Sequence, residues 1–437
     1  MAASAPAAKS LGLAACTAVV VGNMVGTGFY LSPAAVAPYG TLAILGWIVM
    51  GVGAVCLGLT FARLARMAPA TGGPYAYTRM AYGDFAGFLV AWGYWISIWA
   101  SLPAIALGFA GAIMDLFPAL QSRVMALALT LGAIWSVVLV NLRGVKAAGL
   151  FAEITVYTKL VPFAAVALVG LFYIRTENMP SFNPSGESLL SASASLAPLI
   201  MFGYLGLESA TVPAGDVKDP TRTIPRATIL GISIAALLYV LGTVVAFGVV
   251  PAAELAKSVA PFTDAARRMW GDWGAGAIAA AVIVSSIGAL NGWTLMMGQV
   301  PMAAAQDGVF PRPFGRVSSR GVPSIGIVIS AGLATALVGV QALGSPGLRA
   351  FYNLVVNLST MAAVIPYAFC ALAVGLIAAG RGERLRVGPI EIVAFAFSLF
   401  TIYGCGAEAV LYGLMLLLLG IPAFVWQRHR ALGAAKS

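Results

Sequence analysis

Charged side chains are scarce in this chain, since only 9% of its 437 residues are Asp, Glu, Lys or Arg. A soluble domain carries about 25% charged residues, so this chain has too few charges to cover a water-facing surface. Histidine is rarer still: the single example is His429, close to the C-terminus. These shortages exclude an ordinary soluble domain and a Ser-His-Asp triad, and we expect no catalytic residues.

Cysteine is also scarce, and its spacing carries no metal signature. Cys16, Cys56, Cys370 and Cys405 lie in or beside apolar runs, without a CxxC pair. We interpret them as packing residues and expect no metal and no cofactor. The net charge of +10 would suit nucleic acid, but the basic residues lie in short loops between apolar runs. We therefore expect the lipid bilayer, and no nucleic acid, as a partner.

What the sequence does contain is apolar runs, because 60% of its residues are hydrophobic. A transmembrane helix needs about 20 such residues, and the runs predict about twelve spans near 12–32, 42–64, 85–114, 124–141, 148–174, 190–212, 226–250, 274–302, 323–343, 350–379, 388–404 and 407–427. Most lysines and arginines then fall in cytoplasmic segments if both termini are cytoplasmic. We expect one transmembrane domain over 1–430 in a bacterial inner membrane, and a cytoplasmic tail over 428–437.

Two of these runs contain segments that should interrupt a helix. The first carries Gly22, Asn23 and Gly26 at mid-membrane depth, and the sixth places Gly203, Gly206 and polar residues within 202–209. Each glycine costs about 1 kcal/mol in a helix interior. Gly22 and Gly26 also have the GxxxG spacing of a packing face, which is the alternative. Broken helices at corresponding positions of two repeats indicate a transporter binding site.

A broken helix frees backbone groups that cannot stay bare in hydrocarbon. Near Thr27 and Gly28, the start of the second half-helix offers N–H groups and a positive dipole end to a carboxylate. Carbonyl groups freed before the breaks can accept hydrogen bonds from an ammonium. The sequence therefore predicts that one small zwitterion satisfies both sets of groups.

Ionisable side chains inside the membrane are functional candidates. Glu208 follows the second interruption, and we interpret it as a proton-responsive acid; a fixed partner for a hydroxyl group is the alternative. Lys159 lies in the middle of the fifth run, where a buried ammonium could replace a coupling cation; reaching to the interface is the alternative. Glu391 and Glu408 lie near the ends of the last two runs, where we expect solvation.

Several motifs together resemble the amino acid–polyamine–organocation superfamily, in particular the bacterial basic amino acid/polyamine antiporters. They are found at 22–28, 72–77, 206–210, 261–266 and 292–295. The resemblance implies an all-α membrane fold with a five-plus-five inverted repeat, in which helices 1 and 6 are broken. The first repeat would cover 12–174 and the second 190–379, with two extra helices in 388–427.

The resemblance also implies site residues. Substrate contacts are expected at Asn23, Met24, Gly26, Thr27, Gly28, Ser97, Ile98, Leu102, Ile105, Phe202, Leu205, Trp293 and Ser359. Gates are expected at Tyr94, Phe202, Trp293 and Tyr367, and proton or pH coupling at Glu208 and Lys159. Leu102 stands where arginine–agmatine antiporters have asparagine, which removes a polar partner for a guanidinium.

We therefore expect a secondary transporter, and no enzyme, that exchanges or proton-couples a small amino acid or amine by alternating access. An arginine–agmatine or other polyamine antiporter proper is the first alternative. An integral membrane enzyme and a channel are more remote ones. The oligomeric state stays open, with a homodimer among the states considered.

Overall fold

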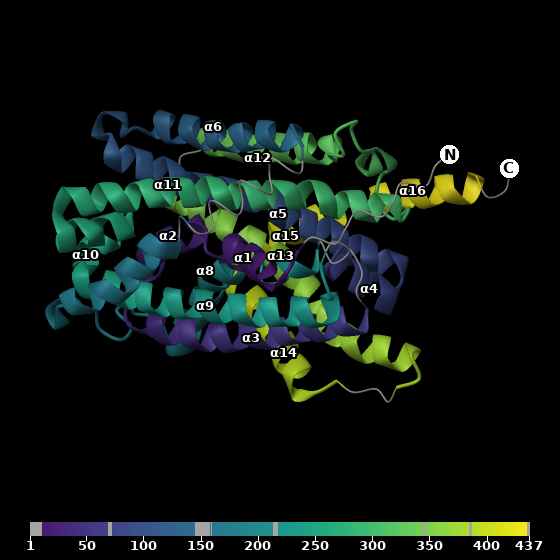
Figure 1. Cartoon of the computed structure of the whole chain (residues 1–437), viewed down its shortest axis with the longest axis horizontal. Helices are drawn as coiled ribbons and strands as arrows, with labels where there is room; N and C mark the ends of the chain where they lie inside the picture. The colour runs from purple at the N-terminus through teal and green to yellow at the C-terminus, as the bar shows by residue number, and fades with distance from the viewer. Residues whose placement is uncertain are drawn as a thin grey trace.

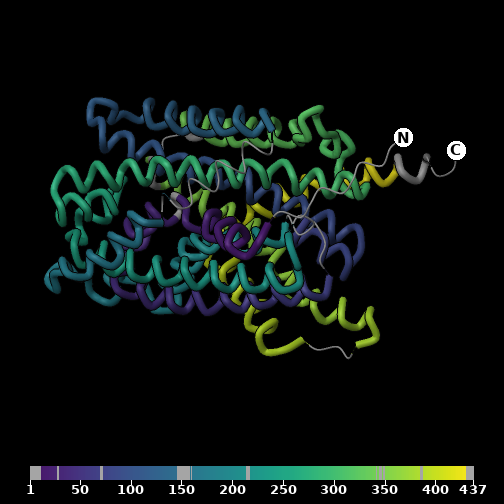
Figure 2. The backbone as a smooth tube through the Cα atoms, in the orientation of Figure 1, coloured from purple at the N-terminus to yellow at the C-terminus, as the bar shows by residue number. Residues whose placement is uncertain are grey.

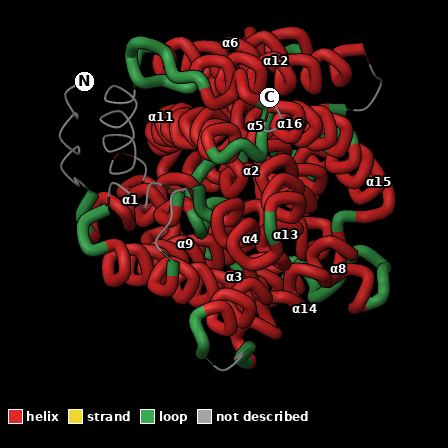
Figure 3. Tube along the Cα trace, turned by 90° about the vertical axis from the view of Figure 1, so that its right-hand side faces the viewer, coloured by secondary structure: helices red, strands yellow, loops and turns green. Residues whose placement is uncertain are grey.

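The computed structural model describes residues 11–68, 72–144, 158, 160–212, 217–343, 347–383 and 387–434. All regular structure in these ranges is helical (Figure 3). Their one β pairing is an isolated parallel bridge between Leu11 and Val217. The helices run roughly along the long axis of the molecule, with α4 and α16 at one end and α10 at the other (Figure 1).

The named helices and 3₁₀ turns follow one another along the described residues. In the first part of the chain they are α1 (Leu13–Met24), α2 (Thr27–Val36), η1 (Ala37–Tyr39), α3 (Leu42–Met67), α4 (Pro74–Tyr82), α5 (Asp84–Leu116), η2 (Pro118–Leu120), α6 (Arg123–Leu142), η3 (Gly170–Tyr173) and η4 (Thr176–Asn178). In the second part they are α8 (Leu189–Tyr204), η5 (Ser209–Thr211), α9 (Pro220–Val249), α10 (Ala252–Leu255), α11 (Pro261–Gln306), η7 (Arg312–Gly315), α12 (Ser324–Leu343), α13 (Leu348–Gly380), α14 (Pro389–Gly404), α15 (Gly406–Leu418) and α16 (Ile421–Ala434).

The prediction of an all-α membrane protein is confirmed. Within the described ranges, 8 helical stretches are long and apolar enough to cross a bilayer. Shorter apolar helices lie at Leu160–Tyr173, Leu189–Tyr204, Ser324–Val340 and Pro389–Gly404. Helix is present at every range expected from the apolar runs. The number of spans that cross the membrane, and the inverted repeat, stay predictions.

Two helices differ from the expected boundaries, and a glycine marks the difference in each. α11 begins well before residue 274, and its early part is set off by Gly271, which has φ 72°. The last expected run is interrupted between α15 and α16 at Gly420. A Cβ on Gly420 would lie 2.8 Å from ring atoms of Trp92, so only glycine allows this close approach. α16 continues to Ala434, well into the expected tail.

The helices pack in layers that can be followed end-on (Figure 3). α3 packs along α9, α1 also packs on α9, and α8 contacts α3. On the other side, α5 packs on α11, α6 and α13, while α12 covers α6 and α11. The same separation, with α6 and α12 at one edge and α3 and α9 at the other, is visible along the backbone (Figure 2). α1 and α8, which end at the two interruptions, belong to the first group and also contact α11 and α13, respectively.

The expectation for Glu391 is wrong, because this carboxylate is buried and paired. Its residue is 3% exposed, one oxygen lies 2.8 Å from Nη1 of Arg63, and the other accepts the N–H of Gly388 at 2.8 Å. The pairing spans more than three hundred positions in sequence, so local hydropathy cannot reveal it. Glu408 is exposed, as expected.

The cysteines pack as expected. Cys16, Cys370 and Cys405 are buried, Cys56 is half-buried, and all four are free thiols.

Candidate functional site

The first expected helix interruption is present between α1 and α2. Val25 leaves the helical region with ψ 77°, and Gly26 is extended with φ −124° and ψ −166°. Gly26 at the start of α2 has no side chain that could cap the helix, and the first N–H groups of any helix have no intrahelical partners. A Cβ on Gly26 would lie 2.9 Å from Cβ of Ala289 in α11, which favours glycine at this crossing.

The second interruption follows Tyr204, where α8 ends. The chain turns through Leu205, Gly206 and Leu207, and resumes only as the 3₁₀ turn η5. Gly206 has φ 96°, a conformation that L side chains avoid. A Cβ there would also lie 3.0 Å from Cβ of Asn23, so the two interruptions touch each other.

Asn23 connects the two interruptions to α11. Its Nδ2 donates to Oγ of Ser209 at 2.8 Å and approaches Sδ of Met296 at 3.4 Å. Its carbonyl oxygen accepts a long bond of 3.4 Å from Nε1 of Trp293. A Cβ on Gly292 would lie 2.2 Å from Oδ1 of Asn23, so the glycine makes room for this amide.

Several carbonyl groups freed by the interruptions already have protein partners. The carbonyl of Val25 lies 3.5 Å from Oγ of Ser285, and that of Gly203 accepts from the Tyr239 hydroxyl at 2.7 Å. Such bonds remove most of the cost of burying an irregular backbone. A ligand is therefore left with fewer carbonyl groups than the sequence alone suggests, whereas the start of α2 stays uncapped.

A small cavity of about 10 Å³ lies beside both interruptions. The residues around it come from α1, the two breaks, α5, α8 and α11: Asn23, Met24, Gly26, Ser101, Ile105, Phe202, Leu205 and Trp293. None of these described lining residues carries a charge. In this conformation the cavity is narrow, with room for roughly one water molecule, so a larger ligand needs the surrounding side chains to move.

Most of the expected contact residues surround this cavity, and some do not. Ser97, Ile98, Leu102 and Ser359 are buried but do not line it; Oγ of Ser97, for example, donates to the Tyr94 carbonyl at 2.7 Å. Their role as contacts stays a prediction.

Three further expected residues cannot be placed fully. Thr27 and Gly28 begin α2, but only their backbone is described. Lys159 lies outside the described residues.

Ser101 is a lining residue that the sequence did not single out. It lies in the middle of the apolar helix α5, and its Oγ donates to the Ile98 carbonyl at 2.7 Å. Serine in an apolar helix commonly makes such a bond to the preceding turn, so the residue type alone gives no functional signal. Its spacing from Ile105, one helical turn later, could have indicated a shared face.

Glu208, Tyr94 and Tyr367 converge on one point outside the cavity. The Glu208 carboxylate accepts a short hydrogen bond from the Tyr94 hydroxyl and one of 2.5 Å from the Tyr367 hydroxyl. All three residues are 0% exposed. The carboxylate comes from the second interruption, and the two phenols come from α5 and α13. Two of the expected gates, Tyr94 and Tyr367, therefore form one hydrogen-bonded group with Glu208.

Two further cavities lie along α5. Gly108 and Ala112 line a cavity of about 10 Å³, and Gly111 and Met114 line one of about 100 Å³. These residues follow Ser101 on successive turns, toward the end of α5. In the opposite direction, Tyr94 is buried about two turns before Ser101. The described cavities thus lie toward the Met114 end of α5, its hollow end, whereas Tyr94 in the opposite direction is buried.

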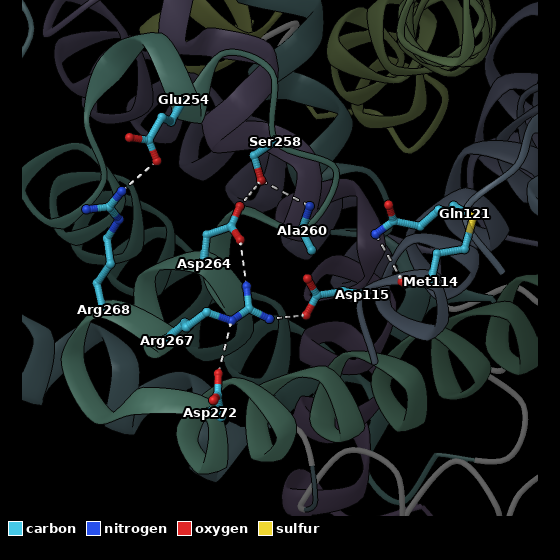
Figure 4. Close-up of polar contacts among 10 residues, drawn as sticks. All are labelled: Met114, Asp115, Gln121, Glu254, Ser258, Ala260, Asp264, Arg267, Arg268 and Asp272. Atoms are coloured by element: carbon cyan, nitrogen blue, oxygen red, sulfur yellow. Dashed lines mark hydrogen bonds and ion pairs between the residues drawn. The ribbon is translucent and has the colours of Figure 1, made fainter. Parts of the chain in front are cut away.

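A group of charged residues surrounds that hollow end (Figure 4). Arg267 of α11 lies 2.8 Å from Asp115 of α5, 3.2 Å from Asp264 and 3.6 Å from Asp272. Ser258, which lines the largest of the three cavities along α5, donates to Asp264 at 2.5 Å. The contact between Arg267 and Asp115 ties the end of α5 to the early part of α11.

Broken membrane helices around a small uncharged cavity are typical of one class of membrane transport protein. A sequence model of the family described as "Amino acid permease" matches residues 11–421, and the chain belongs to this family. The resemblance to the amino acid–polyamine–organocation superfamily is confirmed.

Named relatives make the likeness more specific. The chain is 30% identical to the putrescine transporter PotE of Escherichia coli (strain K12) over 421 residues, covering 94% of each chain. It is 31% identical to the cadaverine/lysine antiporter of the same organism over 405 residues, covering 91% of this chain and 88% of that protein. The putrescine transporter PotE of Haemophilus influenzae is 29% identical over 418 residues, covering 94% of this chain and 95% of the relative.

Proposed function

We propose that this protein is a secondary transporter that exchanges or proton-couples a small amino acid or amine by alternating access. The observation that carries the proposal is the cavity beside both helix interruptions. A site at the point where two membrane helices are broken can be reached from either side when the flanking helices rock. The family and the named relatives support transport rather than an enzymatic reaction.

The substrate that fits this cavity best is an α-amino acid with an uncharged side chain. Its carboxylate would accept hydrogen bonds from the uncapped start of α2, next to Gly26. Its side chain would face Ile105, Phe202 and Trp293, which are apolar or aromatic. A second cation on the substrate would find no carboxylate among the described lining residues, and an unpaired buried charge is costly.

A polyamine antiporter is the second candidate. The relatives named for putrescine and for cadaverine and lysine favour it. A diamine could still bind through the faces of Trp293 and Phe202, which attract cations.

Gating is proposed for two groups of residues. Phe202 and Trp293 would close directly over the substrate, since both line the cavity. Tyr94 and Tyr367 would close the path on the other side through their bonds to Glu208. A proton arriving on Glu208 would turn a double acceptor into a donor and rearrange both bonds. Lys159 stays a proposed participant in coupling.

The proposed architecture has twelve spans in a five-plus-five inverted repeat, followed by two further helices. In it, α1, α3, α8 and α9 would rock as one body against the layer of α5, α6, α11 and α12; the packing within each group supports this division. Both termini would be cytoplasmic in a bacterial inner membrane, so the hollow end of α5 would face outward. A homodimer remains among the proposed assemblies.

Counterflow in proteoliposomes tests the function. Vesicles containing the purified chain are loaded with one unlabelled compound, and uptake of its labelled form is followed for neutral amino acids, lysine, putrescine and cadaverine. We expect saturable uptake that internal neutral amino acid accelerates. Acceleration only by the diamines would favour the polyamine antiporter. A flux that neither saturates nor responds to internal substrate would contradict a transporter.

A further inference from the structure

Another cavity lies at the end of α3 and shares no described lining residue with the substrate cavity. It has a volume of about 360 Å³ and lies between α3, α9 and the start of α14. The residues that line it are Leu59, Ala62, Arg63, Arg66, Ile229, Gly388, Pro389, Ile390 and Glu391. Of these nine residues, five have apolar side chains, two are arginines, one is a glutamate and one is a glycine. The cavity is therefore amphiphilic and carries a net positive charge.

The carboxylate in this cavity already has two partners within the protein. Both oxygens of Glu391 are bonded, one to Arg63 and one to the N–H of Gly388, each at 2.8 Å. A Cβ on Gly388 would lie 2.8 Å from that second oxygen, so glycine is needed for the contact. Glu391 therefore fixes Arg63 at the cavity wall and cannot also neutralise a second cation there.

Two guanidinium groups remain available to a ligand. The side chain of Arg63 is 38% exposed, and its bond to Glu391 uses one of the five N–H groups of a guanidinium. Arg66 is exposed and takes no part in the ion pairs among the described residues. Leu59, Arg63 and Arg66 recur at helical spacing, so they share one face of α3.

The surroundings of this cavity are a lipid-facing surface. Ile390 is 41% exposed, Ile392 57% and Val393 45%, and Leu230 of α9 is 46% exposed. The end of α3 and the start of α14 place the arginines at the level where a membrane helix meets the headgroups. A ligand that suits this place has a phosphate for the arginines and acyl chains for the apolar wall.

We propose that this cavity binds the headgroup phosphate of an anionic phospholipid, held by Arg63 and Arg66 between α3, α9 and α14. Arginine recognises phosphate through paired N–H donors, and basic pockets between membrane helices are known to suit anionic headgroups. The lipid links α3 and α9, which pack together, to α14 on the edge of the molecule. Its binding therefore stabilises the packing of α14.

Lipid titration of the purified full-length protein in detergent tests the proposal. Binding of phosphatidylglycerol and of phosphatidylcholine is measured by native mass spectrometry, and the melting temperature is recorded beside it. We expect phosphatidylglycerol to bind more tightly and to stabilise more. Arg66→Gln should weaken that binding about fivefold, since one interfacial basic residue is worth about 1 kcal/mol. Arg316→Gln is the matched control, because it removes an exposed arginine outside the cavity.

A second variant separates binding from folding. Arg63→Gln alone would leave Glu391 buried without its cation, so Arg63→Gln is combined with Glu391→Gln. The double variant should fold and bind phosphatidylglycerol more weakly than wild type. Equal binding of the two lipids, or Arg66→Gln behaving like Arg316→Gln, would overturn the proposal. Stabilisation by inorganic phosphate as strong as by phosphatidylglycerol would also overturn it, in favour of a free anion.

Discussion

The two helix interruptions occupy corresponding places in the expected repeats but differ in construction. The first spans only Val25 and Gly26, and a regular helix resumes at once. The second needs a positive φ at Gly206, resumes only as a 3₁₀ turn, and carries Glu208. The first is open to the cavity through Gly26, whereas the carboxylate of the second is enclosed by two phenols.

From this difference we propose that the two interruptions have separate roles, one in binding the substrate and one in responding to protons. The uncapped start of α2 is a surface on which a carboxylate can bind. The second interruption holds its only ionisable group away from the cavity, where a proton can change hydrogen bonds without touching the substrate. The hydrogen bond between Asn23 and Ser209 joins the two interruptions, so a structural change at one interruption shifts the other.

The largest effect is expected from Trp293→Ala. Trp293 lines the cavity and reaches the carbonyl of Asn23 at the first interruption. Removing a buried aromatic contact of this kind costs about 2 kcal/mol or more, so uptake should fall at least about 30-fold. Initial rates in proteoliposomes measure it. Trp273→Ala is the control in the same helix, because Trp273 is 72% exposed. Near-normal uptake would remove Trp293 from the substrate site.

Gly206→Ala tests the shape of the second interruption. An alanine there must adopt φ near 96° and meet Asn23, which costs on the order of 1–3 kcal/mol. We expect a lower melting temperature and a fall in transport of about tenfold. Gly332→Ala in α12 is the matched control, since its Cβ would meet nothing within 4 Å. If both variants behave alike, the positive φ has no part in function.

Glu208→Gln separates the shape of the enclosed group from its ability to take a proton. Glutamine keeps the size of glutamate and an acceptor for one phenol, but it has no titratable proton. Exchange should persist within about tenfold of wild type, with a flatter dependence on pH. Rates measured from pH 5 to 8 check this, with exposed Glu408→Gln as the control. A pH profile that keeps its wild-type slope would argue against proton coupling at Glu208.

The smallest effect is expected from Ser101→Ala. The Ser101 hydroxyl is bonded to the Ile98 carbonyl, so its loss should change the Michaelis constant about two- to fivefold and leave the maximal rate alone. Ser136→Ala is the control, because Ser136 makes the same kind of bond to Ala133 at 2.8 Å in α6. An unchanged Michaelis constant would show that Ser101 lines the cavity without contributing to substrate binding.

The sequence predicted those parts of the fold that depend on residues close together in the chain. Apolar runs of membrane length located the helices, and glycines beside polar residues located both interruptions. The role given to Glu208 came first from its place after the second interruption, and those of Tyr94 and Tyr367 came from the family resemblance. The structure brings these three side chains together. The sequence alone could not predict this contact, because hydropathy does not record which faces of α5 and α13 meet.

The parts that were missed depend on contacts between distant segments. Glu391 was expected to be solvated, but Arg63 from another helix lets it be buried. Ser101 looked like any serine that bonds to its own helix. Carbonyl groups freed before the breaks were expected to accept hydrogen bonds from an ammonium, yet those of Val25 and Gly203 already have Ser285 and Tyr239 as partners. For Glu391 and the two carbonyl groups, the deciding partner lies far away in the sequence.

The burial of the cysteines has a practical consequence for chemical labelling. With three thiols buried and Cys56 half-buried, the native chain should offer little to a water-soluble maleimide. A cysteine introduced at exposed Glu254 near α10, or at His429 in α16, would then react from one side of a sealed vesicle only. Comparing the two would reveal which end of the molecule faces the cytoplasm, without removing any native thiol.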